Sequence, residues 1–215
     1  PEAAVFGLSV NGDGELSAAA GETLVGLIER CDAVVLGPGM GPDADTGAIL
    51  DAVLGNPLKG VALLLDAAMI AAAAGRETAL RGWQRRLVFT PHAGEMAALM
   101  ACDAEDASAD LAEAAAKRFH AVVVLKTAET WIAAPDAETL HYSGGGPGLA
   151  TGGSGDVLAG VISGLLSRGA DPQVAAAWGV WLHGEAGRQL AERVGPLGFL
   201  GRELPAEVPG LMASI

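Results

Sequence analysis

The sequence predicts an α/β fold, a doubly wound and mostly parallel sheet with helices on both faces. Short runs of β-branched or leucine-rich residues recur along the chain, and longer alanine-rich segments separate them. The runs are apolar at every position, which is typical of strands that are covered on both faces. Strands that alternate with helices form right-handed βαβ units, and successive units build a parallel sheet.

The expected elements follow one another through the first part of the chain. The apolar runs predict strands at 33–36, 61–65, 87–89 and 121–125, and the segments between them predict helices at 45–54, 67–74, 94–100 and 108–119. Two further runs, 131–134 and 139–142, flank a turn-forming Pro-Asp-Ala-Glu sequence. This pattern predicts a small antiparallel hairpin at the edge of the sheet.

Two helices are expected after the hairpin. The first spans about 156–169, and the second spans about 171–194, with Asp171 as its N-cap and a proline at its first helical position. Gly160 and Gly164 are four residues apart and therefore share one side of the first helix. We expect a neighbouring element to approach that side closely.

Composition restricts the classes of function. A chain of 215 residues fits one domain, residues 1–215, and its net charge of −13 argues against nucleic acid or an anionic membrane as the main partner. Cys31 and Cys102 are too few for a disulfide framework, and no signal peptide is recognisable, so we expect a cytoplasmic protein. No apolar run approaches the roughly 20 residues that span a bilayer. Because the chain starts at Pro1, we expect an N-terminally incomplete or processed domain.

Polar motifs follow four of the expected strands. They are Gly-Pro-Gly-Met-Gly at 37–41, Asp66, Thr-Pro-His-Ala-Gly-Glu at 90–95 and Lys-Thr-Ala-Glu-Thr at 126–130. Open α/β sheets bind ligands at the carboxyl ends of their strands. The sequence therefore predicts the functional site at this edge.

The richest motif is the glycine-rich stretch before the first of the two late helices. Residues 146–160 read Gly-Pro-Gly-Leu-Ala-Thr-Gly-Gly-Ser-Gly-Asp-Val-Leu-Ala-Gly. Free N–H groups at a helix N-terminus, preceded by a flexible glycine loop, form a site for phosphate. A carboxylate beside a phosphate is repelled unless it is a base toward a hydroxyl that meets that phosphate. Asp156 in this setting predicts phosphoryl transfer.

Structural roles remain open for several of these residues. Segment 37–41 also fits a tight turn, Asp66 also fits a helix cap, and Lys126 also fits a surface ion pair with Glu129. We interpret His183 as a packed histidine. We interpret Trp178 and Trp181 as core residues.

These motifs together resemble the ribokinase-like superfamily, and within it the ADP/ATP-dependent NAD(P)H-hydrate dehydratases. The resemblance runs from about Cys31 to Pro209, and its strongest marks are 37–41, 90–95 and 149–160. The Thr-Pro-His-x-Gly-Glu pattern separates these dehydratases from the vitamin-precursor kinases of the same superfamily. The sequence Leu-His-Gly-x-Ala-Gly at 182–187 also matches.

The resemblance implies a reaction. The substrate is NADHX or NADPHX, in which the dihydronicotinamide ring carries an added hydroxyl group. The enzyme phosphorylates this hydroxyl from ADP or ATP with Mg²⁺ and then eliminates phosphate, which restores NADH or NADPH. The family also implies a homo-oligomer, possibly a tetramer.

The resemblance assigns roles to residues of the matching motifs. Asp156 is the catalytic base and also contacts the substrate. The other substrate-binding residues are Gly39, Gly41, His92 and Glu95. The nucleotide and its phosphates are bound by Lys126, Thr127, Ala128, Glu129, Thr130, Gly152, Gly153, Ser154 and Gly155.

Departures from the family pattern keep two other functions open. Family members carry a preceding strand–helix unit with a Gly-Ala motif, and this chain begins after it. One alternative is a kinase for a small vitamin-precursor alcohol, and the other is a degenerate nucleotide-binding relative. The altered motif positions are Ala68 for aspartate, Ala93 for proline, Thr127 for glycine and Gly146 for asparagine.

Overall fold

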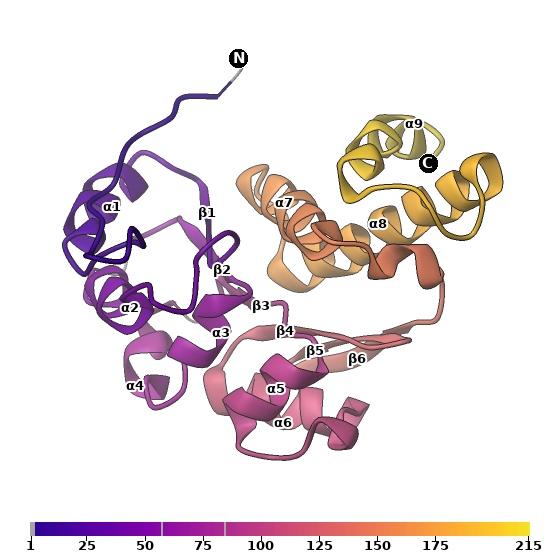
Figure 1. Cartoon of the computed structure of the whole chain (residues 1–215). Helices are drawn as coiled ribbons and strands as arrows, with labels where there is room; N and C mark the ends of the chain where they lie inside the picture. Colours follow the sequence, from indigo (N-terminus) through magenta and orange to yellow (C-terminus); the bar gives the residue numbers. More distant parts are fainter. Residues whose placement is uncertain (1–2, 57, 84) are drawn as a thin grey trace.

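In the computed structural model, residues 3–56, 58–83 and 85–215 are described, and they form a six-stranded sheet in which spatial order equals chain order (Figure 1). Strands β1 to β4 are parallel, β5 is antiparallel to β4, and β6 is antiparallel to β5. The predicted parallel sheet with an edge hairpin is confirmed. The strands are β1 (Ala33–Leu36), β2 (Ala62–Leu65), β3 (Leu87–Phe89), β4 (Val122–Lys126), β5 (Thr130–Ala134) and β6 (Ala137–Tyr142).

Helices cover both faces of the sheet, as the sequence predicts (Figure 1). The largest cluster of buried side chains lies between one face and the helices that precede β1 or connect the parallel strands. These helices are α1 (Ala20–Ile28), α2 (Thr46–Leu54), α3 (Ala68–Ala72), α4 (Glu77–Leu80), α5 (Ala93–Met100) and α6 (Ala109–Phe119), with the 3₁₀ turns η1 (Arg81–Trp83) and η2 (Ala104–Asp106).

The opposite face is covered by the two long helices that follow the hairpin. Apolar side chains of α7 (Ser154–Ser167) and α8 (Pro172–Val194) form a second buried cluster with the strands. A third cluster joins α8 to the C-terminal elements. The remaining elements are η3 (Pro147–Ala150), η4 (Gly201–Ala206) and α9 (Val208–Ala213).

Two expectations about these helices are wrong. No atom of another element lies within 4 Å of a Cβ placed on Gly160 or Gly164, so nothing described in the structure approaches that side of α7. The close contact is made by Gly179 of α8 against Ile162 of α7. Trp178 is not a core residue, since 41% of it is exposed on the outer side of α8. A glycine spacing indicates where approach is permitted, and the packing partner decides where it occurs.

The hairpin is tighter than the sequence suggests. Ala134 pairs directly with Ala137, so the turn contains only Pro135 and Asp136, and β6 begins two residues before the expected strand.

None of the helices formed by the described residues is both long and apolar enough to cross a bilayer.

Candidate active site

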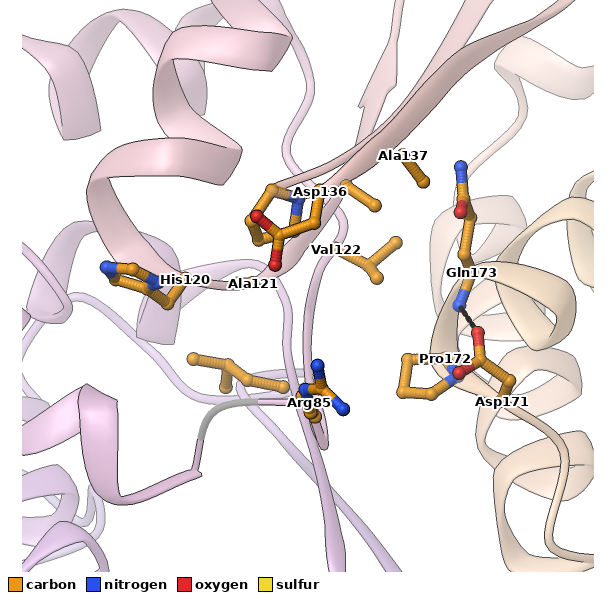
Figure 2. Close-up of a pocket in the computed structure, with 12 residues that line it drawn as sticks. Arg85, His120, Ala121, Val122, Asp136, Ala137, Asp171, Pro172 and Gln173 are labelled. Carbon is orange, nitrogen blue, oxygen red and sulfur yellow. Dashed lines mark hydrogen bonds between the residues drawn. The ribbon is translucent and has the colours of Figure 1, made fainter.

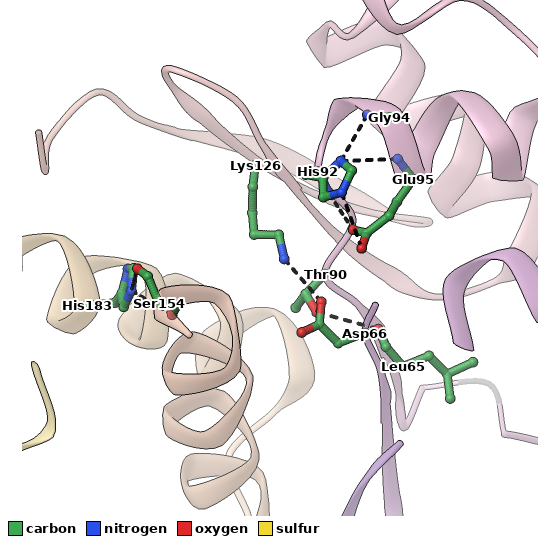
Figure 3. Close-up of polar contacts among 9 residues, drawn as sticks. All are labelled: Leu65, Asp66, Thr90, His92, Gly94, Glu95, Lys126, Ser154 and His183. Atoms are coloured by element: carbon green, nitrogen blue, oxygen red, sulfur yellow. Dashed lines mark hydrogen bonds and ion pairs between the residues drawn. The ribbon is translucent and has the colours of Figure 1, made fainter. Parts of the chain in front are cut away.

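The carboxyl ends of β2, β3 and β4 bring three polar side chains together (Figure 3). The Lys126 Nζ lies 3.1 Å from Asp66 Oδ1, and the Thr90 hydroxyl donates a hydrogen bond of 2.8 Å to the same oxygen. Asp66 is only 2% exposed, and Thr90 is fully buried. The expectation that these motifs share one edge of the sheet is confirmed.

Parallel pairing of the backbone places these residues side by side. Beyond the last paired residues of β3 and β4, the Lys126 N–H donates to the Pro91 carbonyl at 2.8 Å, and His92 forms an isolated parallel bridge with Lys126. Asp66 and Thr90 each follow the last paired residue of their strand, and Lys126 lies further along β4, level with His92. The ammonium group consequently reaches across β3 to the carboxylate at the end of β2.

Two of the structural alternatives are wrong. Lys126 does not pair with Glu129, whose carboxylate lies 2.8 Å from the His141 Nε2. The Asp66 side chain does not cap a helix either, because the N-cap of α3 is Ala67 and no side chain bonds to that helix end. Asp66 instead anchors a cation at the edge of the sheet.

The glycine loop ends in a helix N-terminus with free amides. Gly153 has a φ of +82°, a left-handed conformation that favours glycine, and α7 begins directly after it at Ser154. The helix thus starts two residues earlier than expected, which places Asp156 in its first turn. In the described part of the chain, the N–H groups of Gly155 and Asp156 have no backbone acceptor. Two donors and an exposed carboxylate therefore share this turn.

Lys126 also faces this helix terminus. A Cβ placed on Gly155 would lie 3.5 Å from the Lys126 Nζ. The ammonium group therefore lies between the Asp66 carboxylate and the first turn of α7, while the space over Gly152 and Gly153 is open for 4 Å around their Cβ positions. Free N–H groups, the positive end of the helix and a cation all favour an anion at this place. The arrangement is suited to holding a phosphoryl group beside the Asp156 carboxylate.

His183 of α8 supports the same turn from behind. Its Nε2 lies 2.9 Å from the Ser154 hydroxyl and 3.0 Å from the Ser154 carbonyl oxygen (Figure 3). The pKa of His183 is lowered from an ordinary 6.5 to about 4, mainly by burial; the hydrogen bond to the Ser154 carbonyl opposes this shift, and the Lys126 charge adds to it. His183 is therefore neutral at pH 7. His183 is packed, as the sequence predicts, and its packing partner is the N-terminus of α7.

This lowered pKa predicts a pH-dependent stability. The unfolded chain takes up a proton on His183 below about pH 6.5, whereas the folded protein does so only near pH 4. The free energy of unfolding should therefore fall as the pH is lowered through this window, by about 3 kcal/mol from this residue. Urea unfolding of the protein and of His183→Gln at pH 7.5 and pH 4 measures the effect. Equal losses in the two proteins would contradict the assignment.

His92 and Glu95 form a reciprocal cap at the start of α5. The His92 Nδ1 accepts hydrogen bonds from the N–H groups of Gly94 at 3.0 Å and Glu95 at 3.2 Å. Glu95 returns one, since its carboxylate accepts the His92 N–H at 2.8 Å. The His92 side chain is 60% exposed, and its Nε2 lies 3.4 Å from the Glu95 carboxylate. The proposed substrate contact of these residues stays a prediction.

The cap makes a prediction about stability. His92→Ala should lower the free energy of unfolding by about 1 kcal/mol, because two helical N–H groups lose their acceptor. His92→Asn is the matched control, since an asparagine oxygen can accept the same N–H groups. Chemical denaturation of both variants tests this. Equal destabilisation would show that the cap contributes nothing.

In the glycine motif at 37–41, one of the two predicted substrate-binding residues already has a hydrogen-bond partner. The Gly41 N–H donates to the Glu15 carboxylate at 3.0 Å, whereas no described atom lies within 4 Å of a Cβ on Gly39. Substrate binding by Gly39 and Gly41 stays a prediction.

The turn at Lys126–Thr130, between β4 and β5, is closed by a hydrogen bond of 3.0 Å from the Thr127 N–H to the Glu129 carbonyl.

Some functional positions could not be assigned from the sequence. Thr90 lies within a recognised motif, but nothing in the sequence shows that it bonds to Asp66. Gly201 had no signal at all, although a Cβ on it would lie 2.9 Å from the Gly152 carbonyl oxygen and 3.1 Å from the Ser154 nitrogen. The start of η4 therefore packs directly on the glycine loop, 47 residues or more away along the chain.

The structure also has a cavity far from this edge (Figure 2). This open pocket of about 320 Å³ lies between the amino ends of β3 and β4, the hairpin turn and the start of α8. Asp171 caps α8 there by accepting the Gln173 N–H at 3.0 Å, so this helix terminus offers no comparable anion site. We assign the candidate active site to the carboxyl edge, where the free N–H groups and the cation meet.

We searched residues 3–56, 58–83 and 85–215 for side chains that could hold a metal ion without help from a ligand. These residues contain no group of three or more histidine, cysteine, aspartate or glutamate side chains arranged for a metal ion. Mg²⁺ commonly binds to one or two carboxylates together with the phosphates of a substrate. A Mg²⁺ ion at this site would therefore be held mainly by the phosphates of a bound nucleotide.

Comparisons with known proteins show which family the chain matches. The family model of NAD(P)H-hydrate dehydratase matches residues 2–209. The chain is 46% identical over 215 residues to the ADP-dependent (S)-NAD(P)H-hydrate dehydratase of Xanthomonas campestris. The match covers 99% of this chain and 72% of that relative. It is 38% identical to a bifunctional NAD(P)H-hydrate repair enzyme of Moorella thermoacetica, covering 94% of this chain but only 38% of the relative.

A solved structure shares the fold. The ribokinase-like superfamily protein of Enterococcus faecalis superposes with a TM-score of 0.77 at 29% sequence identity. The match covers 89% of this chain and 66% of that protein. The sequence-derived expectation of a ribokinase-like arrangement is thus confirmed.

Proposed function

The chain belongs to the NAD(P)H-hydrate dehydratase family, as its motifs suggested, and we propose that it returns NADHX and NADPHX to NADH and NADPH in a nucleotide-dependent reaction. The observation that carries the proposal is the first turn of α7. Its free Gly155 and Asp156 N–H groups, the facing Lys126 ammonium group and the Asp156 carboxylate meet at one place. This arrangement combines an anion site with a base.

Asp156 is the proposed base. Its carboxylate takes the proton of the ring hydroxyl, and the hydroxyl oxygen attacks the terminal phosphorus of the nucleotide. The bond from that phosphorus to the bridging oxygen breaks, so ADP would leave as AMP and ATP as ADP. Loss of phosphate from the ring, with a proton from the neighbouring carbon, then restores the double bond. General base catalysis of this kind contributes about 10²–10⁴-fold in rate.

The α7 terminus and Lys126 stabilise the transferred group. The phosphoryl oxygens carry developing negative charge during transfer, and donors already oriented toward them need no rearrangement. Asp66 and Thr90 hold the Lys126 ammonium group in place. The Gly152, Gly153 and Ser154 segment leaves room for the phosphates, since the Cβ positions of its two glycines face open space.

The remaining assignments follow the family motifs. We propose that residues Lys126 to Thr130 bind the nucleotide and that Gly39, Gly41, His92 and Glu95 bind the hydrated ring. ADP is the proposed donor, because the 46% identical relative is named as ADP-dependent. Mg²⁺ would neutralise phosphate charge while being held mainly by the nucleotide phosphates, which leaves the Asp156 carboxylate free as the base.

The test is an assay of NADH hydrate with Mg²⁺ and either ADP or ATP. Nucleotide-dependent recovery of the dihydronicotinamide absorbance is expected, with ADP as the better donor. A phosphorylated product that persists would identify a kinase instead. Tight ADP binding without turnover, by calorimetry on the same folded sample, would identify a nucleotide-binding relative.

A further inference from the structure

We propose that His183 is a positioning residue that orients the Ser154–Gly155 peptide, so that the Gly155 N–H points out of α7 at the transferred phosphoryl group. The inference rests on the proposed function, because it assigns a target to that N–H. It concerns a residue of α8 whose Nε2 contacts Ser154, the first residue of α7. Three features of the structure support it.

The first feature is the direction of the hydrogen bond. The His183 Nε2 lies 3.0 Å from the Ser154 carbonyl oxygen, and a carbonyl oxygen can only accept. The hydrogen of the neutral ring is therefore on Nε2, which donates to this carbonyl and to the Ser154 hydroxyl oxygen at 2.9 Å. The contact is well protected, since Ser154 is only 3% exposed.

The second feature is the geometry of the peptide. The Ser154 carbonyl and the Gly155 N–H belong to one planar, trans peptide group, so they point in opposite directions. A hydrogen bond that fixes the carbonyl therefore fixes the N–H as well. The Gly155 N–H has no backbone acceptor within the described residues, and the Lys126 ammonium group lies beside that residue. His183 thus controls, from inside the protein, a donor that faces the site.

The third feature is the constraint on the other side of the loop. The backbone of Gly201, at the start of η4, lies so close that a Cβ there would be 2.9 Å from the Gly152 carbonyl oxygen and 3.1 Å from the Ser154 nitrogen. The peptide is consequently held between α8 and η4. Side-chain caps perform this task at α5, α6 and α8, whereas the N-cap of α7 is a glycine. The contacts with α8 and η4 thus fix the backbone at 152–154 without using the Gly155 and Asp156 N–H groups.

The experiment compares three variants by steady-state kinetics. His183→Leu removes the donor and should lower kcat about 10- to 100-fold, with the KM for the nucleotide changed less than about threefold. His183→Gln keeps an N–H donor and should stay within about fivefold of the unchanged protein. Ile162→Val is the matched control, since it removes one methyl group from the contact of α7 with Gly179 without touching Ser154. It should leave kcat unchanged.

A second readout does not depend on turnover. In protein labelled with ¹⁵N-glycine, the Gly155 amide signal should shift when inorganic phosphate or ADP is added, and the Gly155→Ala variant identifies that signal. The shift should persist in His183→Gln and Ile162→Val and be at least halved in His183→Leu. Melting temperatures of all variants give the folded fraction.

The two readouts separate the possible failures. If the unchanged protein shows no turnover but its Gly155 signal responds to phosphate in a His183-dependent way, the proposed function fails and the positioning role stands. Loss of activity in His183→Leu that only follows the folded fraction would overturn the positioning role. So would an equal loss of kcat in His183→Gln, because the donor is then irrelevant.

Discussion

Asp156→Asn should lower kcat by about 10²–10⁴-fold, because the amide cannot take the proton of the ring hydroxyl. The affinity for ADP should change less than about threefold, since the Gly155 and Asp156 N–H groups and the Lys126 ammonium group are retained. Asparagine has nearly the same shape as aspartate, and the side chain is exposed, so folding should be unaffected. Single-turnover kinetics with NADH hydrate, together with calorimetric titration of ADP, measures both quantities.

The control for this variant changes a carboxylate outside the candidate site. Asp136→Asn alters an exposed side chain in the β5–β6 turn, beside the amino ends of β3 and β4, and is expected to keep kcat unchanged. Turnover by Asp156→Asn within tenfold of the unchanged protein would exclude Asp156 as the base. A large loss of ADP affinity would instead indicate that its charge binds a nucleotide-associated cation.

Lys126→Met should have two separate effects. It removes a cation from the phosphoryl site, for which a loss of about 10²–10³-fold in kcat is expected. It also leaves the Asp66 carboxylate, 2% exposed, without its ion-pair partner. Breaking a buried pair by removing one partner costs about 3 kcal/mol or more in the free energy of unfolding. Urea unfolding and steady-state kinetics on the same preparation measure the two effects.

A double variant separates stability from catalysis. In Asp66→Asn with Lys126→Met, no unpaired charge remains, and the asparagine oxygen still accepts the Thr90 hydroxyl. Stability should therefore recover to within about 1 kcal/mol, while kcat stays low. Recovery of both would mean that Lys126 acts only on the fold. Recovery of neither would mean that the pair does not account for the lost stability.

The edge of the sheet that carries the polar motifs could be predicted because it depends on short-range sequence signals. Runs that are apolar at every position define the buried strands, and the residue that ends each run, such as Asp66 or Lys126, falls at the carboxyl edge whatever the details of packing. The glycine loop before an apolar helix likewise carries its own conformation. The expected strands at 33–36 and 87–89 coincide with β1 and β3, and the others differ by a residue or two.

The contacts between these signals could not be predicted. Lys126 and Asp66 are 60 residues apart, and His183 and Ser154 are 29 residues apart. The sequence offered Glu129, three residues away, as the nearer partner for Lys126, but the β4–β5 turn directs Glu129 toward His141. A local spacing describes which pairs are near along the chain, whereas sheet pairing places the end of β4 beside the end of β2.

For this protein the sequence by itself determined the parallel sheet, the edge that carries the polar motifs and the family to which the chain belongs. Apolar patterning and backbone conformation are local properties, and a motif is read along the chain. Only the tertiary structure decided that Asp66 anchors Lys126, that His183 and Gly201 hold the glycine loop from two sides, and that Gly179 rather than Gly160 or Gly164 makes the close helix contact. These depend on which surfaces pack together, and packing is set by the whole folded chain.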